Sequence, residues 1–379
     1  MSQEICILPF FGQGHLLPCF QLCNHLTSST NFNVTLLISS TLSTSVPSSL
    51  LQNHLFQLIL IPSPPPSPEH SHDELAKGLL NVLSDYHRST RPVCAIVDVM
   101  MSWSNDIFKK LEIPTVAFFT SGACSAVMEL VEWKARPLEL RPGEIRFVPG
   151  LPDDMVLTYS DVKRRRHEPP PPPPHHGFTP PPGGFGPGKM GPPKHGDQPP
   201  WLNEVRDTIA LMINTCDDLE QPFIDYIANH VGKPVWGVGP LLPEQYWKSF
   251  DSVIHDRDFR SNRLSSITEE EVVQWLDSKP NGSVLYISFG TEVGPTIDEY
   301  TELAQAIESC KQPFIWVVQP GPGRPDPPHL GVVGIQRLMS DEEIKTNAVV
   351  LSAKFHNGFP RSSVAALDAF KDCINKIFV

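Results

Sequence analysis

The sequence lacks any long uninterrupted apolar segment. Even the apolar stretch Leu55–Ile61 is closed by Pro62, whereas a membrane-spanning helix needs about 20 apolar residues. The first residues, Met1–Glu4, are polar and acidic where a secretory signal carries positive charge. We therefore expect no membrane span, no export signal and a cytoplasmic location.

The chain also lacks an excess of positive charge and any cysteine pair of the Cys-x-x-Cys type. Its formal net charge is −12, so the surface as a whole has no electrostatic footprint for nucleic acid. The 8 cysteines include no Cys-x-x-Cys pair, and no histidine or cysteine cluster has the spacing of a metal site. We expect buried thiols in a reducing compartment, no nucleic-acid partner and no metal.

The sequence does contain enough apolar material for two domains. It has 379 residues, and 40% of them are hydrophobic, which is more than one core usually holds. Short apolar runs alternate with helical patterns in the first half, at Ile5–Phe10, Asn33–Ser39, Phe56–Ile61, Val93–Asp98 and Thr115–Phe119. This βαβ alternation predicts an α/β fold with a parallel sheet, in an N-terminal domain over 1–235.

A proline-rich insert interrupts the first domain over 168–200. It holds about a third of the chain's 41 prolines and almost no large aliphatic residue, so it cannot bury enough surface to fold alone. Its run of six prolines also fits a polyproline II helix that docks on a partner's aromatic groove. We favour a flexible lid beside a ligand cleft over such a protein contact.

The second half has room for an abbreviated domain. After a linker predicted over 236–267, Thr268-Glu-Glu-Glu271 forms a capping box. Strands are predicted at Ser283–Phe289 and Phe314–Val318 with a helix between them, which makes one βαβ unit. The remaining residues are taken up by helices, the last of them at Ser363–Ile377. We therefore expect a truncated C-terminal domain over 268–379.

The turn Gly12-Gln-Gly14 after the first strand favours a ligand site, although not a nicotinamide site. A dinucleotide-binding turn needs a third glycine, and an acidic residue about twenty positions on at the end of the second strand. Leu17 stands in place of the third glycine, and the second strand ends in Ser39-Ser40. An oxidoreductase is therefore the weakest of the functions considered.

His15 is the strongest candidate for chemistry. It lies where the first strand ends and the first helix begins, which is where open α/β sheets bind ligands. The helix dipole disfavours the imidazolium there, and a general base must start as neutral imidazole. Asp98 ends the fourth predicted strand at the same edge, so it is the candidate that orients the imidazole. The pattern alone leaves an ordinary loop-start role open for Asp98.

Several stretches resemble the plant family-1 UDP-glycosyltransferases. Gly12-Gln-Gly-His15-Leu-Leu-Pro18 is similar to their catalytic-histidine motif, and Ala95-Ile-Val-Asp98 is similar to the stretch that carries their aspartate. Further similar stretches follow in the same order, at Phe119–Ser121, Asn214–Glu220, Val235–Pro240, Trp275–Pro280, Leu285–Thr291 and Pro313–Val318. The resemblance covers nearly all of the chain except the proline-rich insert.

The resemblance implies a GT-B fold, with two Rossmann-like domains of which the first binds an acceptor and the second a UDP-sugar. It implies that His15 deprotonates a hydroxyl of a small lipophilic acceptor, that Asp98 stabilises the imidazolium, and that a sugar, expected to be glucose, is transferred with inversion. No cofactor or metal is implied beyond the co-substrate. Candidate site residues are Gly14, Phe119 and Thr120 for the acceptor pocket, and Ser288, Gly290 and Thr291 for the diphosphate of the donor.

One part of the family's site is missing from the sequence. The family's donor box has a His-Cys-Gly-Trp-Asn-Ser core, and no such run follows Val318. Two functions therefore stay open: a UDP-glycosyltransferase that holds its donor weakly, and a catalytically silent small-molecule-binding or interaction protein derived from one. The affinity for UDP-sugar separates them.

Overall fold

The computed structural model describes residues 3–30, 32–62, 72–89, 92–135, 140–153, 155–159, 198–248, 268–289, 297–310, 312–317 and 342–377. These residues fall into two compact units. The first unit holds the described residues up to 159, together with 198–248 and 354–377. The second holds the described residues between 268 and 353.

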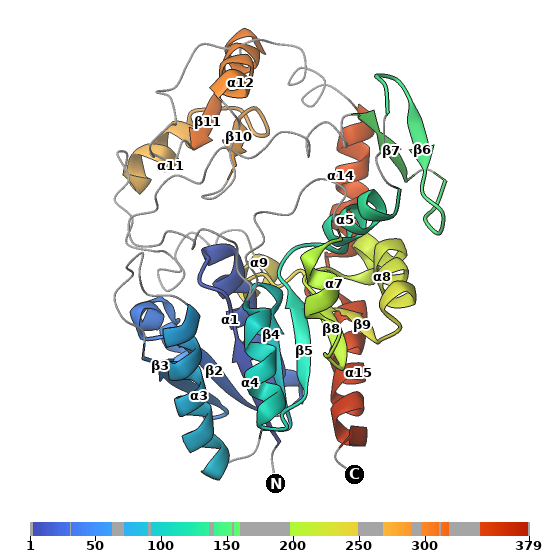
Figure 1. Cartoon of the computed structure of the whole chain (residues 1–379). Coiled ribbons are helices and arrows are strands. Elements are labelled where there is room, and N and C mark those ends of the chain that lie inside the picture. Colours follow the sequence, from blue (N-terminus) through green and yellow to red (C-terminus); the bar gives the residue numbers. More distant parts are fainter. Residues whose placement is uncertain are drawn as a thin grey trace. The chain divides into compact units, whose positions relative to one another are not determined.

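A 7-stranded parallel sheet forms the centre of the first unit (Figure 1). Its strand order is β3-β2-β1-β4-β5-β8-β9. The second and third strands of the sequence therefore lie on one side of β1, and all later strands of the sheet lie on the other side. The strands are β1 (Glu4–Leu8), β2 (Asn33–Ser39), β3 (Phe56–Ile61), β4 (Cys94–Asp98), β5 (Thr115–Phe119), β8 (Ala210–Ile213) and β9 (Val235–Gly237). The five apolar runs predicted as strands in the first half all lie in this sheet.

Helices cover both faces of the sheet, and for this reason its central strands are apolar on both sides. Every residue of β1, β4 and β5 is buried. Neighbouring side chains point to opposite faces, so Phe118 lies in one core cluster and Phe119 in another. The helices of this unit are α1 (Gln13–His25), α2 (Ser48–Leu51), α3 (His72–Ser89), α4 (Asn105–Lys110), α5 (Ala123–Ala135), α7 (Pro200–Glu204), α8 (Asp217–Val231), α9 (Glu244–Lys248) and α15 (Arg361–Ile377).

Shorter elements complete the first unit. Two 3-10 turns follow β2 and β4, at Ser40–Ser45 and Val99–Ser104, and a π-helical turn, Leu26–Thr30, ends α1. An antiparallel hairpin is formed by β6 (Ile145–Phe147) and β7 (Val156–Thr158). Most of the proline-rich insert, residues 168–197, lies outside the described residues, so its role as a lid or a docking segment stays a prediction.

The helix α15 packs on the first unit, which differs from the expected domain boundary. Leu367, Phe370 and Ile374 recur at helical spacing and are buried in the same cluster as the residues of β1 and α1. Phe370 also meets Trp236 of β9 edge-on, with ring centroids 5.7 Å apart. The expected C-terminal domain over 268–379 is therefore divided, because the apolar face of its last helix fills the core of the first unit.

The expected linker over 236–267 also begins inside the first unit. Val235–Gly237 is β9, the edge strand of the large sheet. Val238 and Leu241 follow it into the core, where they are 0% and 3% exposed. The prolines at 234 and 240 flank this short strand, which made the segment resemble an interdomain connection.

The second unit contains one βαβ element, as predicted. The βαβ element consists of β10 (Leu285–Ser288), α12 (Ile297–Cys310) and β11 (Phe314–Val317). The helix α11 (Glu269–Asp277) precedes it, and the helix α14 (Glu342–Lys354) follows it. The strands β10 and β11 pair in parallel, and Leu285 packs with Ala304 and Ile307 of α12. The predicted capping box is present, since Thr268 and Glu271 exchange side-chain and backbone hydrogen bonds.

Within the described ranges, no helix combines the length and the apolar character that crossing a membrane requires. The longest of these helices, α3, has 18 residues, and charged residues recur along it.

Candidate active site

His15 and Asp98 lie at the point where the strand order of the large sheet reverses. His15 is in the first turn of α1, directly after β1, and Asp98 is the last residue of β4. The strands β1 and β4 are neighbours, while β2 lies on the other side of β1. The carboxyl ends of two neighbouring strands at such a point are the usual ligand position in open α/β sheets.

The two side chains are in direct contact, as the sequence predicted. Nδ1 of His15 lies 2.7 Å from Oδ2 of Asp98. The Asp98 side chain is 0% exposed and that of His15 is 20% exposed. The other carboxylate oxygen, Oδ1, accepts a hydrogen bond from the backbone N–H of Met100 at 2.9 Å. The carboxylate is thus held on both oxygens, and it favours the tautomer in which Nδ1 carries the proton and Nε2 has a free lone pair.

Two further residues fix the imidazole ring. Oγ1 of Thr120 lies 3.0 Å from Nδ1 of His15, and the ring of Phe10 meets the imidazole edge-on at a centroid distance of 5.0 Å. Thr120 follows β5, so three neighbouring strands contribute to the same place. The ring is held on its Nδ1 side, and its partial exposure suits contact with a ligand.

The loop that carries Thr120 is held by a carboxylate from α8. Glu220 accepts hydrogen bonds from the backbone N–H groups of Ala123 at 2.7 Å and Cys124 at 3.2 Å, at the start of α5. A carboxylate there satisfies helix N–H groups and interacts favourably with the helix dipole. In the sequence, Glu220 stands out only as the last residue of a stretch that resembles the family, and nothing in the pattern indicates this contact.

The remaining predicted residues are spread over the two units. A Cβ added at Gly14 would meet nothing within 4 Å, so there is open space beside the first turn of α1. Phe119 is 5% exposed, and its ring packs edge-on against Trp201 at 5.6 Å. Ser288 ends β10 in the second unit, whereas Gly290 and Thr291 lie outside the described residues. The acceptor-pocket and donor-binding roles stay predictions.

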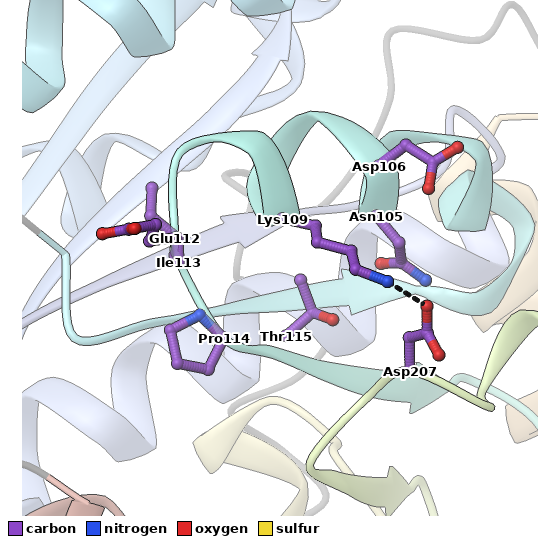
Figure 2. Close-up of a pocket in the computed structure, with 8 residues that line it drawn as sticks. All are labelled: Asn105, Asp106, Lys109, Glu112, Ile113, Pro114, Thr115 and Asp207. Carbon is purple, nitrogen blue, oxygen red and sulfur yellow. Dashed lines mark hydrogen bonds and ion pairs between the residues drawn. The ribbon is translucent and has the colours of Figure 1, made fainter.

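A pocket at the opposite edge of the sheet is separate from this site (Figure 2). It reaches Thr115, the first residue of β5, whereas Thr120 lies beyond the last residue of the same strand. The pocket is lined by Asn105, Asp106, Lys109, Glu112, Ile113, Pro114, Thr115 and Asp207. Figure 2 shows Lys109 pointing toward Asp207, and Nζ of Lys109 donates to Oδ2 of Asp207 at 2.7 Å. It therefore offers nothing to the chemistry of His15.

The thiol beneath the dyad is not a nucleophile. Cys19 is fully buried one turn after His15, and its burial, together with the nearby Asp98 carboxylate, raises its pKa well above the usual range. A thiol in that state carries no thiolate at neutral pH. In the part of the chain that the structure describes, no three His, Cys, Asp or Glu side chains are grouped to hold a metal ion.

Comparison with curated proteins finds plant UDP-glycosyltransferases. UDP-glucose flavonoid 3-O-glucosyltransferase 7 of Fragaria ananassa is 24% identical over 344 residues, which is 83% of this chain and 63% of that protein. Abscisate beta-glucosyltransferase of Phaseolus angularis is 26% identical over 324 residues, 84% of this chain and 62% of that protein. The chain thus spans less than two thirds of the length of these relatives. No family model matches the chain.

Comparison with solved structures gives the fold. The crystal structure of a UGT transferase from Siraitia grosvenorii in complex with UDP covers 99% of this chain and 100% of that chain, with a TM-score of 0.65 and 17% sequence identity. The structural neighbours of this chain are plant UDP-glycosyltransferases. The predicted fold class, an α/β fold of the GT-B type with a parallel sheet, is confirmed.

Proposed function

We propose that this chain belongs to the plant family-1 UDP-glycosyltransferases and transfers a sugar, expected to be glucose, from UDP-sugar to a hydroxyl of a small lipophilic acceptor. The observation that carries the proposal is the contact between Nδ1 of His15 and Oδ2 of Asp98 at 2.7 Å. It lies at the ligand edge of the sheet, and the relatives that support the acceptor class are named for flavonoid and abscisate glucosylation.

In the proposed reaction, His15 acts as the general base. Nε2 accepts the proton of the acceptor hydroxyl while that oxygen attacks the anomeric carbon of the donor. The bond from the anomeric carbon to UDP breaks, UDP leaves with the electron pair, and the configuration inverts. The imidazolium that forms is stabilised by the Asp98 carboxylate, which is buried and already oriented by Met100. The proton then passes from Nε2 to solvent.

The donor side of the site is proposed on fewer residues. Ser288, Gly290 and Thr291 would offer hydroxyl and backbone N–H groups to the diphosphate, after a strand as in other phosphate sites. The sequence has no His-Cys-Gly-Trp-Asn-Ser run to add contacts. We expect donor affinity to be several orders of magnitude lower than in a protein that contains this run. Each missing charge-assisted hydrogen bond is worth roughly 1.5 to 3 kcal/mol, and each 1.4 kcal/mol is about tenfold in affinity.

The missing donor box also favours a second candidate function. A protein that keeps the acceptor site and holds no UDP-sugar would be a catalytically silent binding or interaction protein. In such a protein the dyad would contact an acceptor without turning it over. The proline-rich segment over 168–200 would then be the candidate for contacts with a partner protein.

Calorimetric titration with UDP and with UDP-glucose decides between the two functions. We expect weak binding by this chain, and much tighter binding by a variant in which the donor box of the Fragaria ananassa relative is inserted after Val318. A flavonoid acceptor incubated with UDP-glucose should yield a glucoside whose formation is lost in His15→Gln. The transferase proposal is contradicted if both this chain and the variant with the donor box fail to bind UDP and fail to form glucoside. Binding of the flavonoid without binding of UDP would favour the silent protein.

We further propose that the first unit binds the acceptor, that the second unit binds the donor, and that the protein works in the cytoplasm without a separate cofactor. A reducing compartment is supported by the cysteines. Cys6, Cys19, Cys23, Cys94, Cys124, Cys216 and Cys373 are free thiols, and most of them are buried. Imaging of a fluorescent fusion in plant cells tests it. Retention in the secretory pathway would contradict this part of the proposal.

A further inference from the structure

Asn214 connects the loop after β5, which carries Thr120, to the segment after β9. It comes directly after β8, at the carboxyl edge of the sheet on which His15 and Asp98 lie. Its backbone N–H donates to the carbonyl of Phe119 at 2.8 Å, and its side-chain Nδ2 donates to the carbonyl of Thr120 at 3.1 Å. Two consecutive carbonyls of the loop after β5 are therefore bound by one residue.

The other end of the Asn214 carboxamide is also engaged. Oδ1 accepts a hydrogen bond from the backbone N–H of Leu241 at 2.8 Å. Leu241 is 3% exposed and belongs to the core cluster that α15 completes. The carboxamide thus bridges the loop of Thr120 to a segment that the core holds in place.

The segment after β9 leaves no room for the carboxamide to move. A Cβ added at Gly239 would overlap Oδ1 of Asn214 and come 2.7 Å from the backbone carbonyl carbon of the same residue. The Gly239 backbone is itself fixed, because its N–H donates to Thr215 at 2.7 Å and its carbonyl accepts from the hydroxyl of Ser363, a residue of α15 that is 0% exposed. The position of Asn214 is therefore set by packing, not by its own side-chain preference.

We infer that Asn214 is a positioning residue for the His15–Asp98 dyad, acting through Thr120. The hydroxyl of Thr120 lies 3.0 Å from the same nitrogen, Nδ1, that contacts Asp98. Thr120 can hold the ring only while its own backbone stays in place, and Asn214 binds that backbone. The expected effect of Asn214 on catalysis rests on the proposed function. Its expected effect on the position of the His15 ring rests on geometry alone.

The substitution Asn214→Asp tests the inference with the least change of shape. It keeps an oxygen for the N–H of Leu241 and replaces the donor to Thr120 by a second oxygen. Two oxygens would then face each other, so the Thr120 loop should move and loosen the ring of His15. Selective ¹⁵N labelling of histidine allows the Nδ1–H signal to be followed, and His15→Gln assigns it. We expect exchange of the Nδ1 proton with water to be faster by about tenfold, as for the loss of one hydrogen bond.

Asn53 supplies the matched control. Its Oδ1 accepts from the backbone N–H of Leu55 at 2.9 Å, and its Nδ2 donates to the hydroxyl of Thr27 at 3.0 Å. Asn53→Asp therefore removes the same kind of donor in the same unit without touching the Thr120 loop, and the His15 signal should stay unchanged. An unchanged signal in a folded Asn214→Asp protein overturns the inference.

A second variant covers the case in which Asn214→Asp fails to fold. Gly239→Ala pushes on Oδ1 of Asn214 and leaves the carboxamide chemically intact, so it should speed the same proton exchange. No effect on the His15 signal from Gly239→Ala would then overturn the inference.

Kinetics separates this inference from the proposed function. Where glucoside forms, Asn214→Asp should lower kcat by about tenfold or more with little change in KM for the acceptor, because small displacements of a base are costly. Where the wild-type chain forms no glucoside, the proposed function fails, and the proton exchange still decides the role of Asn214.

Discussion

Gly122 and Glu220 approach each other more closely than any residue with a Cβ would allow. A Cβ at Gly122 would lie 2.7 Å from Oε2 and 2.9 Å from Oε1 of Glu220. The same two oxygens accept the first N–H groups of α5. The absence of a side chain at 122 is what lets a carboxylate from α8 enter the turn after Thr120.

We expect Glu220→Gln to destabilise the first unit by about 1 to 2 kcal/mol, which is the usual cost of losing a helix cap. The amide keeps one acceptor oxygen and loses the charge that interacts with the helix dipole. Urea unfolding followed by tryptophan fluorescence measures the change. Asp225→Asn, at an exposed position of the same helix where the carboxylate accepts a hydrogen bond from Gln221, should leave the midpoint unchanged.

The carboxylate of Asp98 should matter for turnover more than for binding of the acceptor. Asp98→Asn removes the charge that stabilises the imidazolium and can favour the wrong tautomer of His15, so the rate of glucoside formation should fall by at least about a hundredfold. Asp207→Asn, which alters an exposed ion pair on the opposite edge of the sheet, is the control. Equal rates for Asp98→Asn and the wild type would remove the dyad from the mechanism.

Lys233 should contribute to stability through an unusual set of partners. Its Nζ donates to the backbone carbonyls of Val205, Arg206 and Thr208 at 2.6, 2.5 and 2.6 Å, and partial burial lowers its pKa. Lys233→Met keeps the apolar stem and leaves the carbonyls without this donor, which should cost about 1 to 3 kcal/mol.

Lys109→Met is the matched comparison for Lys233. The ammonium of Lys109 pairs with Asp207 at 2.7 Å, and both side chains are mostly exposed, so the loss should not shift the midpoint measurably. Urea unfolding of both variants tests the contrast. A larger effect from Lys109→Met than from Lys233→Met would show that the three carbonyls are well solvated without the lysine.

His25 should make the protein less stable in mild acid. Burial lowers its pKa to about 4, against the nearby charge of Glu244, and its ring stacks on Phe359 at 4.0 Å. Between pH 6.5 and 4 the unfolded chain binds a proton that the folded protein excludes, so stability falls as the pH falls through this range, by about 1 to 3 kcal/mol. His25→Gln should reduce this decline in urea unfolding at pH 7 and 5. An unchanged decline would exclude His25 as its source.

Glu204 should act in the opposite direction over much of the same range. Burial, with a smaller effect of Glu129, raises its pKa to about 7 in spite of a hydrogen bond from Ser102. Between pH 7 and 4.5 the folded protein holds a proton that the unfolded chain releases, so this group adds stability as the pH falls. Glu204→Gln resembles the protonated form and should therefore stabilise the protein at pH 8 and have little effect at pH 5.

The sequence predicted those features that depend on local pattern. Strands such as Asn33–Ser39 and Thr115–Phe119 are short runs rich in apolar and β-branched residues, and their bounds agree with the structure. The contact between His15 and Asp98 was predictable because residues that end parallel strands meet at one edge of the sheet.

Features that depend on tertiary packing were missed. The helical spacing of Leu367 and Phe370 predicts an apolar face but carries no information about which unit it covers. Asn214 is a single polar residue without periodicity. Apart from opening a stretch that resembles the family, its signal was its place directly after the apolar run Ala210–Ile213. The same reasoning that selected Asp98 would have selected it.

The helix α15 has a consequence for the order in which the protein can fold during synthesis. The last strand of the large sheet ends at Gly237, whereas the side chains that complete one of its faces come from Leu367, Phe370 and Ile374. A growing chain on the ribosome must therefore expose part of an apolar sheet face until residues 361–377 have emerged, which makes it a target for chaperones. Residues can be lost between 238 and 361 without removing this closing helix. A premature stop before Arg361 would instead leave the first unit without part of its core.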